Sequence, residues 1–77
     1  MDPKLVDITM HIDQSLQQVD LEMLRDSLLR TKGVMAADYH RQAPHLMIIG
    51  YDPDKIQAME FIRIAQQKGI HAELLGL

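Results

Sequence analysis

The 77-residue sequence has no cysteine and no tryptophan, and it contains only two tyrosines and one phenylalanine. Without cysteine the chain can form no disulfide, no thiolate metal site and no cysteine nucleophile, and thiol redox chemistry is excluded with them. Because Tyr39, Tyr51 and Phe61 are the only phenylalanine, tyrosine or tryptophan residues, the sequence predicts a core made mainly of aliphatic side chains.

Long apolar runs and clusters of basic residues are also missing. No stretch approaches the roughly 20 apolar residues that a membrane-spanning helix needs, and residues 1–4 do not lead into a long apolar run. We therefore expect a cytoplasmic location without membrane insertion. Eight lysines and arginines against 11 acidic residues give a net charge of -3. A surface that neutralises phosphates is not expected, so nucleic acid is excluded as a partner.

The composition that remains is typical of one small soluble domain. Hydrophobic residues make up 47% of the chain and charged residues 25%, a balance found in globular proteins rather than in disordered ones. A chain of this length can bury one modest core and has no room for a second. We predict a single domain that spans residues 1–77.

Apolar periodicity predicts a strand and a helix in the first half of the chain. Residues 5–12 alternate between apolar and polar side chains, which indicates a half-buried strand. Asp20 is placed to accept backbone N–H groups at the start of a helix, and Lys32-Gly33 ends that helix with a cation and a left-handed cap. The helix carries an inward stripe formed by Leu21, Leu24 and Leu28.

The second half predicts a strand, a turn, another strand, a helix and a final strand. These segments cover residues 34–39, 41–44, 45–51, 57–69 and 70–75. Asp52-Pro53 ends the middle strand because proline removes a backbone donor, and Gly69 closes the helix.

The resulting order is βαββαβ, which predicts an α+β fold of the ferredoxin-like type. Right-handed crossovers place the first and third strands in the centre of a four-stranded antiparallel sheet with the order 4-1-3-2. Both helices then cover one face of the sheet, and the other face is left open to solvent.

Four short segments make the chain similar to a known family. They are Met10-His11-Ile12-Asp13, Gly33-Val34, Tyr51-Asp52-Pro53-Asp54-Lys55-Ile56 and Lys68-Gly69-Ile70. In order and spacing they resemble the heavy-metal-associated domains of copper chaperones and metal-pumping P-type ATPases. The resemblance covers nearly the whole chain, and it implies the ferredoxin-like fold more strongly than it implies a function.

The metal loop of that family is degenerate in this chain. Family members that bind soft metals carry a G-M-x-C-x-x-C loop, and alignment without a gap places Ser15 at the methionine position, Gln17 at the first cysteine and Asp20 at the second. Monovalent copper prefers two thiolates, which an amide and a carboxylate do not replace. For Asp20 we favour a role as helix cap over metal ligation.

The histidines offer another metal hypothesis. Strand alternation places His11, His40 and His71 on the open face of the sheet, with His71 near His11 and with His40 at the far edge. His11 and His71, with Glu73 as a further candidate, would bind a borderline transition metal such as zinc, nickel or divalent copper. The alternative is that these are polar side chains on a solvated sheet.

The open face also predicts an interaction surface. Leu46 and Ile48 are adjacent aliphatic residues there, and they share the face with His11, His71 and Glu73. Such a surface can bind a protein partner or form a homodimer. Given the resemblance, a membrane metal transporter is one partner to consider.

No combination of residues predicts catalysis. The sequence has no paired nucleophile and base and no glycine-rich phosphate loop. We therefore predict a non-catalytic interaction, regulatory or accessory module with a link to metal transport. The alternative is a metal carrier that uses His11, His71 and also His40.

Overall fold

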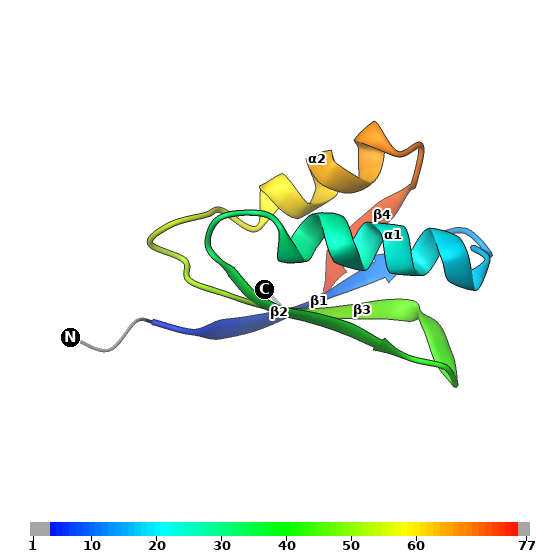
Figure 1. Cartoon of the computed structure of the whole chain (residues 1–77), viewed down its shortest axis with the longest axis horizontal. Helices are drawn as coiled ribbons and strands as arrows, with labels where there is room; N and C mark the ends of the chain where they lie inside the picture. The colour runs from blue at the N-terminus through cyan, green and yellow to red at the C-terminus, as the bar shows by residue number, and fades with distance from the viewer. Residues whose placement is uncertain (1–3, 76–77) are drawn as a thin grey trace.

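The computed structural model describes residues 4–75. In this part of the chain the elements follow in the predicted order of strand, helix, strand, strand, helix, strand (Figure 1). They are β1 (Val6–Ile12), α1 (Gln18–Leu29), β2 (Val34–His40), β3 (Ala43–Tyr51), α2 (Met59–Gln67) and β4 (Ala72–Leu75). No helix within residues 4–75 is long and apolar enough to cross a membrane.

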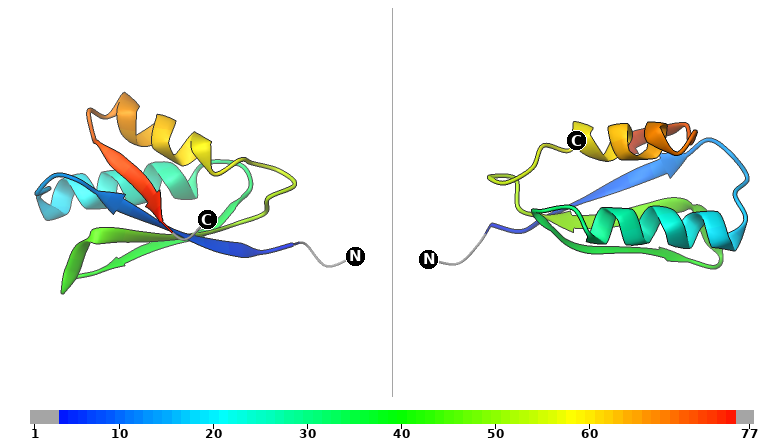
Figure 2. Two further views of the ribbon diagram at one scale, coloured as in Figure 1. Left: turned by 180° about the vertical axis from the view of Figure 1, so that it is seen from behind. Right: turned by 45° about the horizontal axis from the view of Figure 1, so that its top comes forward.

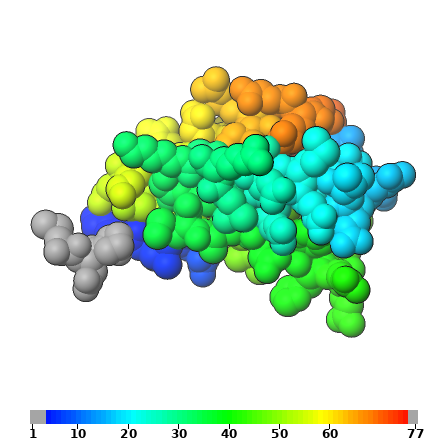
Figure 3. Space-filling model, viewed as in Figure 1, coloured from blue at the N-terminus to red at the C-terminus, as the bar shows by residue number. Residues whose placement is uncertain are grey.

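The strands form one four-stranded sheet in the order β2-β3-β1-β4, with every neighbouring pair antiparallel. This is the predicted strand order, counted from the other edge. Both helices lie on one face of the sheet, and no described element covers the opposite face (Figure 1, Figure 2). In the space-filling view α1 and α2 lie against each other and form a continuous layer over the sheet (Figure 3). The ferredoxin-like α+β fold is therefore confirmed.

The register of β1 separates the two faces of the sheet. Ile8 lies opposite Ile49, and both side chains are buried beneath the helices. The next pair, Thr9 and Ile48, points to the open face, where Ile48 is 44% exposed. Successive strand residues point to opposite faces, so this alternation continues along the strand as predicted.

The core is aliphatic with a single aromatic pair, as the composition predicts. The largest fully buried side chains are Met10, Ile12, Leu24, Leu28, Met47, Ile49 and Phe61. Phe61 of α2 packs edge-on against Tyr51 of β3, with ring centroids 5.0 Å apart and an interplanar angle of 81°. Each side chain of this size contributes about 1.5–3 kcal/mol when it is fully buried, so this set fixes the helices on the sheet.

The helix α1 begins earlier than the sequence predicts. Gln17 occupies the N-cap position without a side-chain capping bond, and Asp20 lies one turn inside, where its N–H donates to the carbonyl oxygen of Gln17 at 3.0 Å. The prediction that Asp20 caps the helix is therefore wrong. Its carboxylate still lies in the first turn, where the positive end of the helix dipole favours a negative charge.

Helix α1 also ends at Leu29, with Arg30 as its C-cap, and not at the predicted Lys32-Gly33. The starts of three other elements differ from the prediction by two residues, because tertiary packing as well as local sequence sets where an element begins. β3 begins at Ala43 and includes Pro44, α2 begins at Met59 and β4 begins at Ala72. A register shift between Tyr39 and His40 interrupts the β2–β3 ladder at this end, which accommodates a proline that has no N–H to donate.

The end of the sheet near Gly33 is fixed by the contacts of Asp52, which we call the Gly33–Asp52 clasp. The N–H of Asp52 donates to the carbonyl oxygen of Gly33 at 2.8 Å. The Asp52 side chain is buried and accepts the N–H of Asp54 at 2.9 Å. The carbonyl oxygen of Asp52 also accepts the N–H of Ile56 at 3.2 Å. The α1–β2 turn and the β3–α2 connection are thereby joined, as their proximity in Figure 1 shows.

We expect Gly33→Ala to destabilise the fold by about 2–4 kcal/mol. Gly33 has a φ of 97°, and an added Cβ would lie 2.9 Å from Cγ2 of Ile56. The substitution therefore combines backbone strain with a steric clash. Equilibrium urea unfolding followed by circular dichroism measures the loss.

Gly69→Ala is the matched control. Gly69 also has a positive φ, 73°, but no atom lies within 4 Å of an added Cβ. Its expected cost is about 1 kcal/mol, since only the left-handed conformation is disfavoured. Equal losses of stability for the two variants would contradict the expected clash between Ile56 and a Cβ added at position 33.

Candidate functional site

The positions that the sequence aligns with the family's metal loop lie at the end of the sheet opposite the Gly33–Asp52 clasp. Ser15, Gln17 and Asp20 are all exposed. Asp20 lines an open cleft of about 390 Å³. The cleft is also lined by Gln14, Leu16, Met23, Lys68, Gly69 and Ile70. A hydroxyl, an amide and a carboxylate offer no soft donor, so this loop does not reproduce a thiolate site for monovalent copper.

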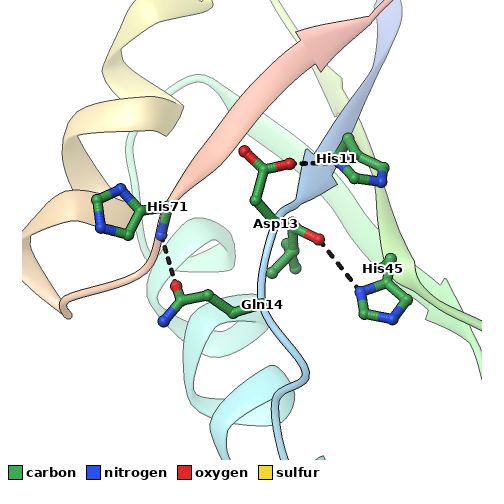
Figure 4. Close-up of polar contacts among 6 residues, drawn as sticks. His11, Asp13, Gln14, His45 and His71 are labelled. Atoms are coloured by element: carbon green, nitrogen blue, oxygen red, sulfur yellow. Dashed lines mark hydrogen bonds and ion pairs between the residues drawn. The ribbon is translucent and has the colours of Figure 1, made fainter.

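The three histidines of the metal hypothesis are not brought together. His11 lies near the end of β1, and His40 lies on β2 at the far edge of the sheet, opposite Ala43. His71 precedes β4, and its N–H donates to Oε1 of Gln14 at 2.7 Å. Figure 4 shows the His71 ring on the other side of Asp13 from His11. Only His11 of this set therefore lies in a group of possible ligands.

The structure instead groups His11 with Asp13 and Glu73, which we call the His11 cluster. One candidate ligand atom from each residue lies within 4.8 Å of the others. His11 and Glu73 are direct partners in the β1–β4 ladder, and Asp13 follows His11 by two residues, so it returns to the same side of the chain. The sequence hypothesis included His11 and Glu73 but missed Asp13, although the i, i+2 spacing was visible.

A short hydrogen bond orients His11 within the cluster. Its Nδ1 lies 2.7 Å from Oδ1 of Asp13, and both side chains are 40% exposed (Figure 4). A carboxylate can only accept, so Nδ1 carries the hydrogen. In the neutral imidazole Nε2 then holds the lone pair.

A second imidazole stacks on His11. The ring centroids of His11 and His45 are 6.2 Å apart and the rings are inclined by 24°. Nδ1 of His45 lies 3.2 Å from the carbonyl oxygen of Ile12, to which it donates. Sequence reasoning placed His45 only at the hairpin end. The register of β2 with β3 shifts between Tyr39 and His40, and because the size of such a shift cannot be read from the sequence, a more specific prediction was not possible.

The open face carries a central apolar strip that we call the open-face patch, formed by Thr9, Leu46, Ile48 and Leu75. Thr9 lies directly opposite Ile48 on one side and opposite Leu75 on the other. Ile48 and Leu75 are 44% and 42% exposed, and Leu46 is half-buried. The structure thus places Leu46, Ile48, His11 and Glu73 on the predicted face.

Acidic side chains surround the patch. Asp7, Asp38 and Glu73 are exposed and share the open face by register. The four strands contain no lysine or arginine. Asp38 approaches Arg25 of α1 at 3.9 Å with its side chain 79% exposed, a geometry that provides little stabilisation. The face is therefore apolar at its centre and negative at its rim.

No family model and no curated protein matches the chain. Solved structures do. Oxidised MerP from Ralstonia metallidurans has a TM-score of 0.84 at 10% identity, over 95% of this chain and 100% of that chain. A copper-binding domain from HMA7, a P-type ATPase, has a TM-score of 0.81 at 16% identity, over 91% of this chain and 93% of that one.

A third similar structure is the apo form of the HMA domain of the copper chaperone for superoxide dismutase. Its TM-score is 0.75 at 18% identity, over 99% of this chain and 72% of that chain. The fold of this chain is therefore that of heavy-metal-associated domains, and the resemblance read from the sequence is confirmed at the level of the fold. Identities this low leave the function to the site itself.

The His11 geometry predicts a defined tautomer. At alkaline pH, where the imidazoles are neutral, we expect His11 and His45 both to be protonated at Nδ1, because each donates from that atom. Long-range proton–nitrogen NMR correlations distinguish the two tautomers directly. Asp13→Ala should shift His11 toward the Nε2-protonated form and leave His45 unchanged as an internal control. An unaltered His11 spectrum would contradict the hydrogen bond.

Proposed function

We propose that the chain is a non-catalytic accessory module that binds a protein partner through the open-face patch. The observation that carries this proposal is the row Leu75, Thr9, Ile48 and Asp38, which crosses all four strands on a face that no described element covers. Adjacent exposed aliphatic residues on such a face gain free energy when a partner removes them from water.

The charge of the rim favours a different protein over a second copy of this chain. A symmetric dimer through the patch would bring two sets of Asp7, Asp38 and Glu73 together, and like charges in an interface oppose association. A partner with an apolar centre and a rim of lysine or arginine would complement both features. The proposed partner is therefore a protein with a basic rim.

Metal handling is the setting that the structural neighbours support. One is described as a copper-binding domain of a P-type ATPase, and another as a domain of a copper chaperone for superoxide dismutase. We propose that this chain works beside proteins of that kind without carrying monovalent copper in the degenerate loop, because Ser15, Gln17 and Asp20 supply no thiolate.

Site-specific crosslinking tests the face that binds. A photoreactive side chain at position 48, at the centre of the patch, should capture a partner in cells that contain one. The same group at position 22, an exposed position on α1, should not capture that partner. Equal capture at the two positions, or none at position 48, would contradict the proposal.

The captured protein must then bind the purified chain with the expected chemistry. Ile48→Lys should weaken binding by about tenfold or more, since it places a cation at an apolar centre facing a basic rim. Asp38→Lys should slow association and reduce its dependence on salt. Glu22→Lys, on the helical face, is the matched control and should leave binding unchanged.

Sedimentation of the isolated chain over a concentration series tests the alternative partner. We expect a monomer throughout. A dimer that is lost in Ile48→Lys would show that the patch pairs two copies of the chain, and it would overturn the choice of a basic partner.

A further inference from the structure

We propose that the His11 cluster is a binding site for one divalent borderline transition metal, such as zinc, nickel or copper(II). This inference does not rest on the proposed interaction function. It uses one imidazole and two carboxylates, from His11, Asp13 and Glu73, whose candidate ligand atoms lie within 4.8 Å of one another. Neither the degenerate loop nor His40 and His71 contributes to it.

The donor set selects the class of ion. An imidazole nitrogen with carboxylate oxygens suits zinc, nickel and divalent copper, whereas monovalent copper prefers sulfur. Calcium takes about six to eight oxygen ligands, which is more than Asp13 and Glu73 can provide. The three residues leave at least one coordination position for water or for a donor from another molecule.

The backbone already supplies most of the required geometry. Ligand atoms about 2.0–2.2 Å from a tetrahedral zinc ion are roughly 3.3 Å from one another. The cluster atoms, at no more than 4.8 Å, have to close by only about 1.5 Å, which side-chain rotation on exposed residues can achieve. His11 and Glu73 are held opposite each other by the β1–β4 ladder. Bringing these two side chains to one ion therefore needs no rearrangement of the backbone.

The charges of the cluster favour a cation. Within residues 4–75, no lysine or arginine forms an ion pair with Asp13 or Glu73, and the contact of Asp13 with His11 is the one ion pair found for either carboxylate. Two neighbouring carboxylates without a strong cation repel each other. A divalent ion relieves that repulsion and replaces it with attraction to both groups.

The His11 side chain is already held beside the carboxylates. Its Nδ1 lies 2.7 Å from Oδ1 of Asp13, and the His45 ring packs on its face with centroids 6.2 Å apart. Both contacts reduce the rotamer freedom that metal binding would otherwise have to remove. His45 is thus a positioning residue in this proposal. When His11 and Asp13 bind one ion together, Nδ1 gives up the hydrogen that Asp13 accepts and becomes the ligand atom.

Calorimetric titration of the untagged protein with zinc, nickel and copper(II) salts is the direct test. We expect one ion to bind per chain with at least one of these metals. His11→Ala and the near-isosteric Glu73→Gln should each weaken binding by about tenfold or more, as lost ligands do.

His40→Ala and His71→Ala are the matched controls, because both are exposed histidines outside the cluster. Each should bind the metal as the wild type does. No binding by the wild type, or an equal loss in the control variants, would overturn the proposal. Circular dichroism of each variant confirms that the fold is retained, and Glu73→Gln provides the test if His11→Ala does not fold.

The titration also separates this site from the proposed interaction function. It requires no partner, and Ile48→Lys should bind the metal normally because Ile48 is not a ligand. Loss of metal binding in Ile48→Lys with its fold intact would contradict the assignment to His11, Asp13 and Glu73.

Discussion

The alternation of side chains along β1 is the constraint on which both faces of the molecule depend, because this strand is hydrogen-bonded to neighbours on both edges. Ile8 and Met10 are buried under the helices by this register, while Thr9 and His11 are left on the open face. A slip of one residue would exchange these sets and would place His11 in an aliphatic core. The burial of the core therefore fixes the surface chemistry as well.

The fold was predictable because the apolar periodicity of the strands and that of the helices point to the same architecture. The site depends on individual contacts, which leave no periodic pattern in the sequence. Alternation in β1 and the leucine spacing of α1 gave the element types correctly. The cap at Gln17 was missed because it uses no side-chain bond, so Asp20 was the more attractive candidate. His71 lies just before β4, and although its carbonyl oxygen still accepts the N–H of Asp13 at 2.9 Å, its ring faces away from His11 (Figure 4).

The His11 cluster and the open-face patch occupy one surface, and Glu73 of the cluster also belongs to the acidic rim of the patch. Glu73 is paired with His11 in the ladder, and Leu75 lies two residues further along the same strand. A bound divalent ion would cancel part of the negative rim that we expect a basic partner to recognise. The two proposed functions are therefore coupled by electrostatics, and each can be measured in the absence of the other.

The Gly33–Asp52 clasp lies at the end of the sheet opposite the β1–α1 loop (Figure 1). Its turn glycine and its buried aspartate secure the sheet at that end. Residues such as Ser15 and Gln17 are exposed and contribute nothing to the core. Substitutions at these exposed loop positions can therefore change the side chains that the loop presents without cost to the architecture.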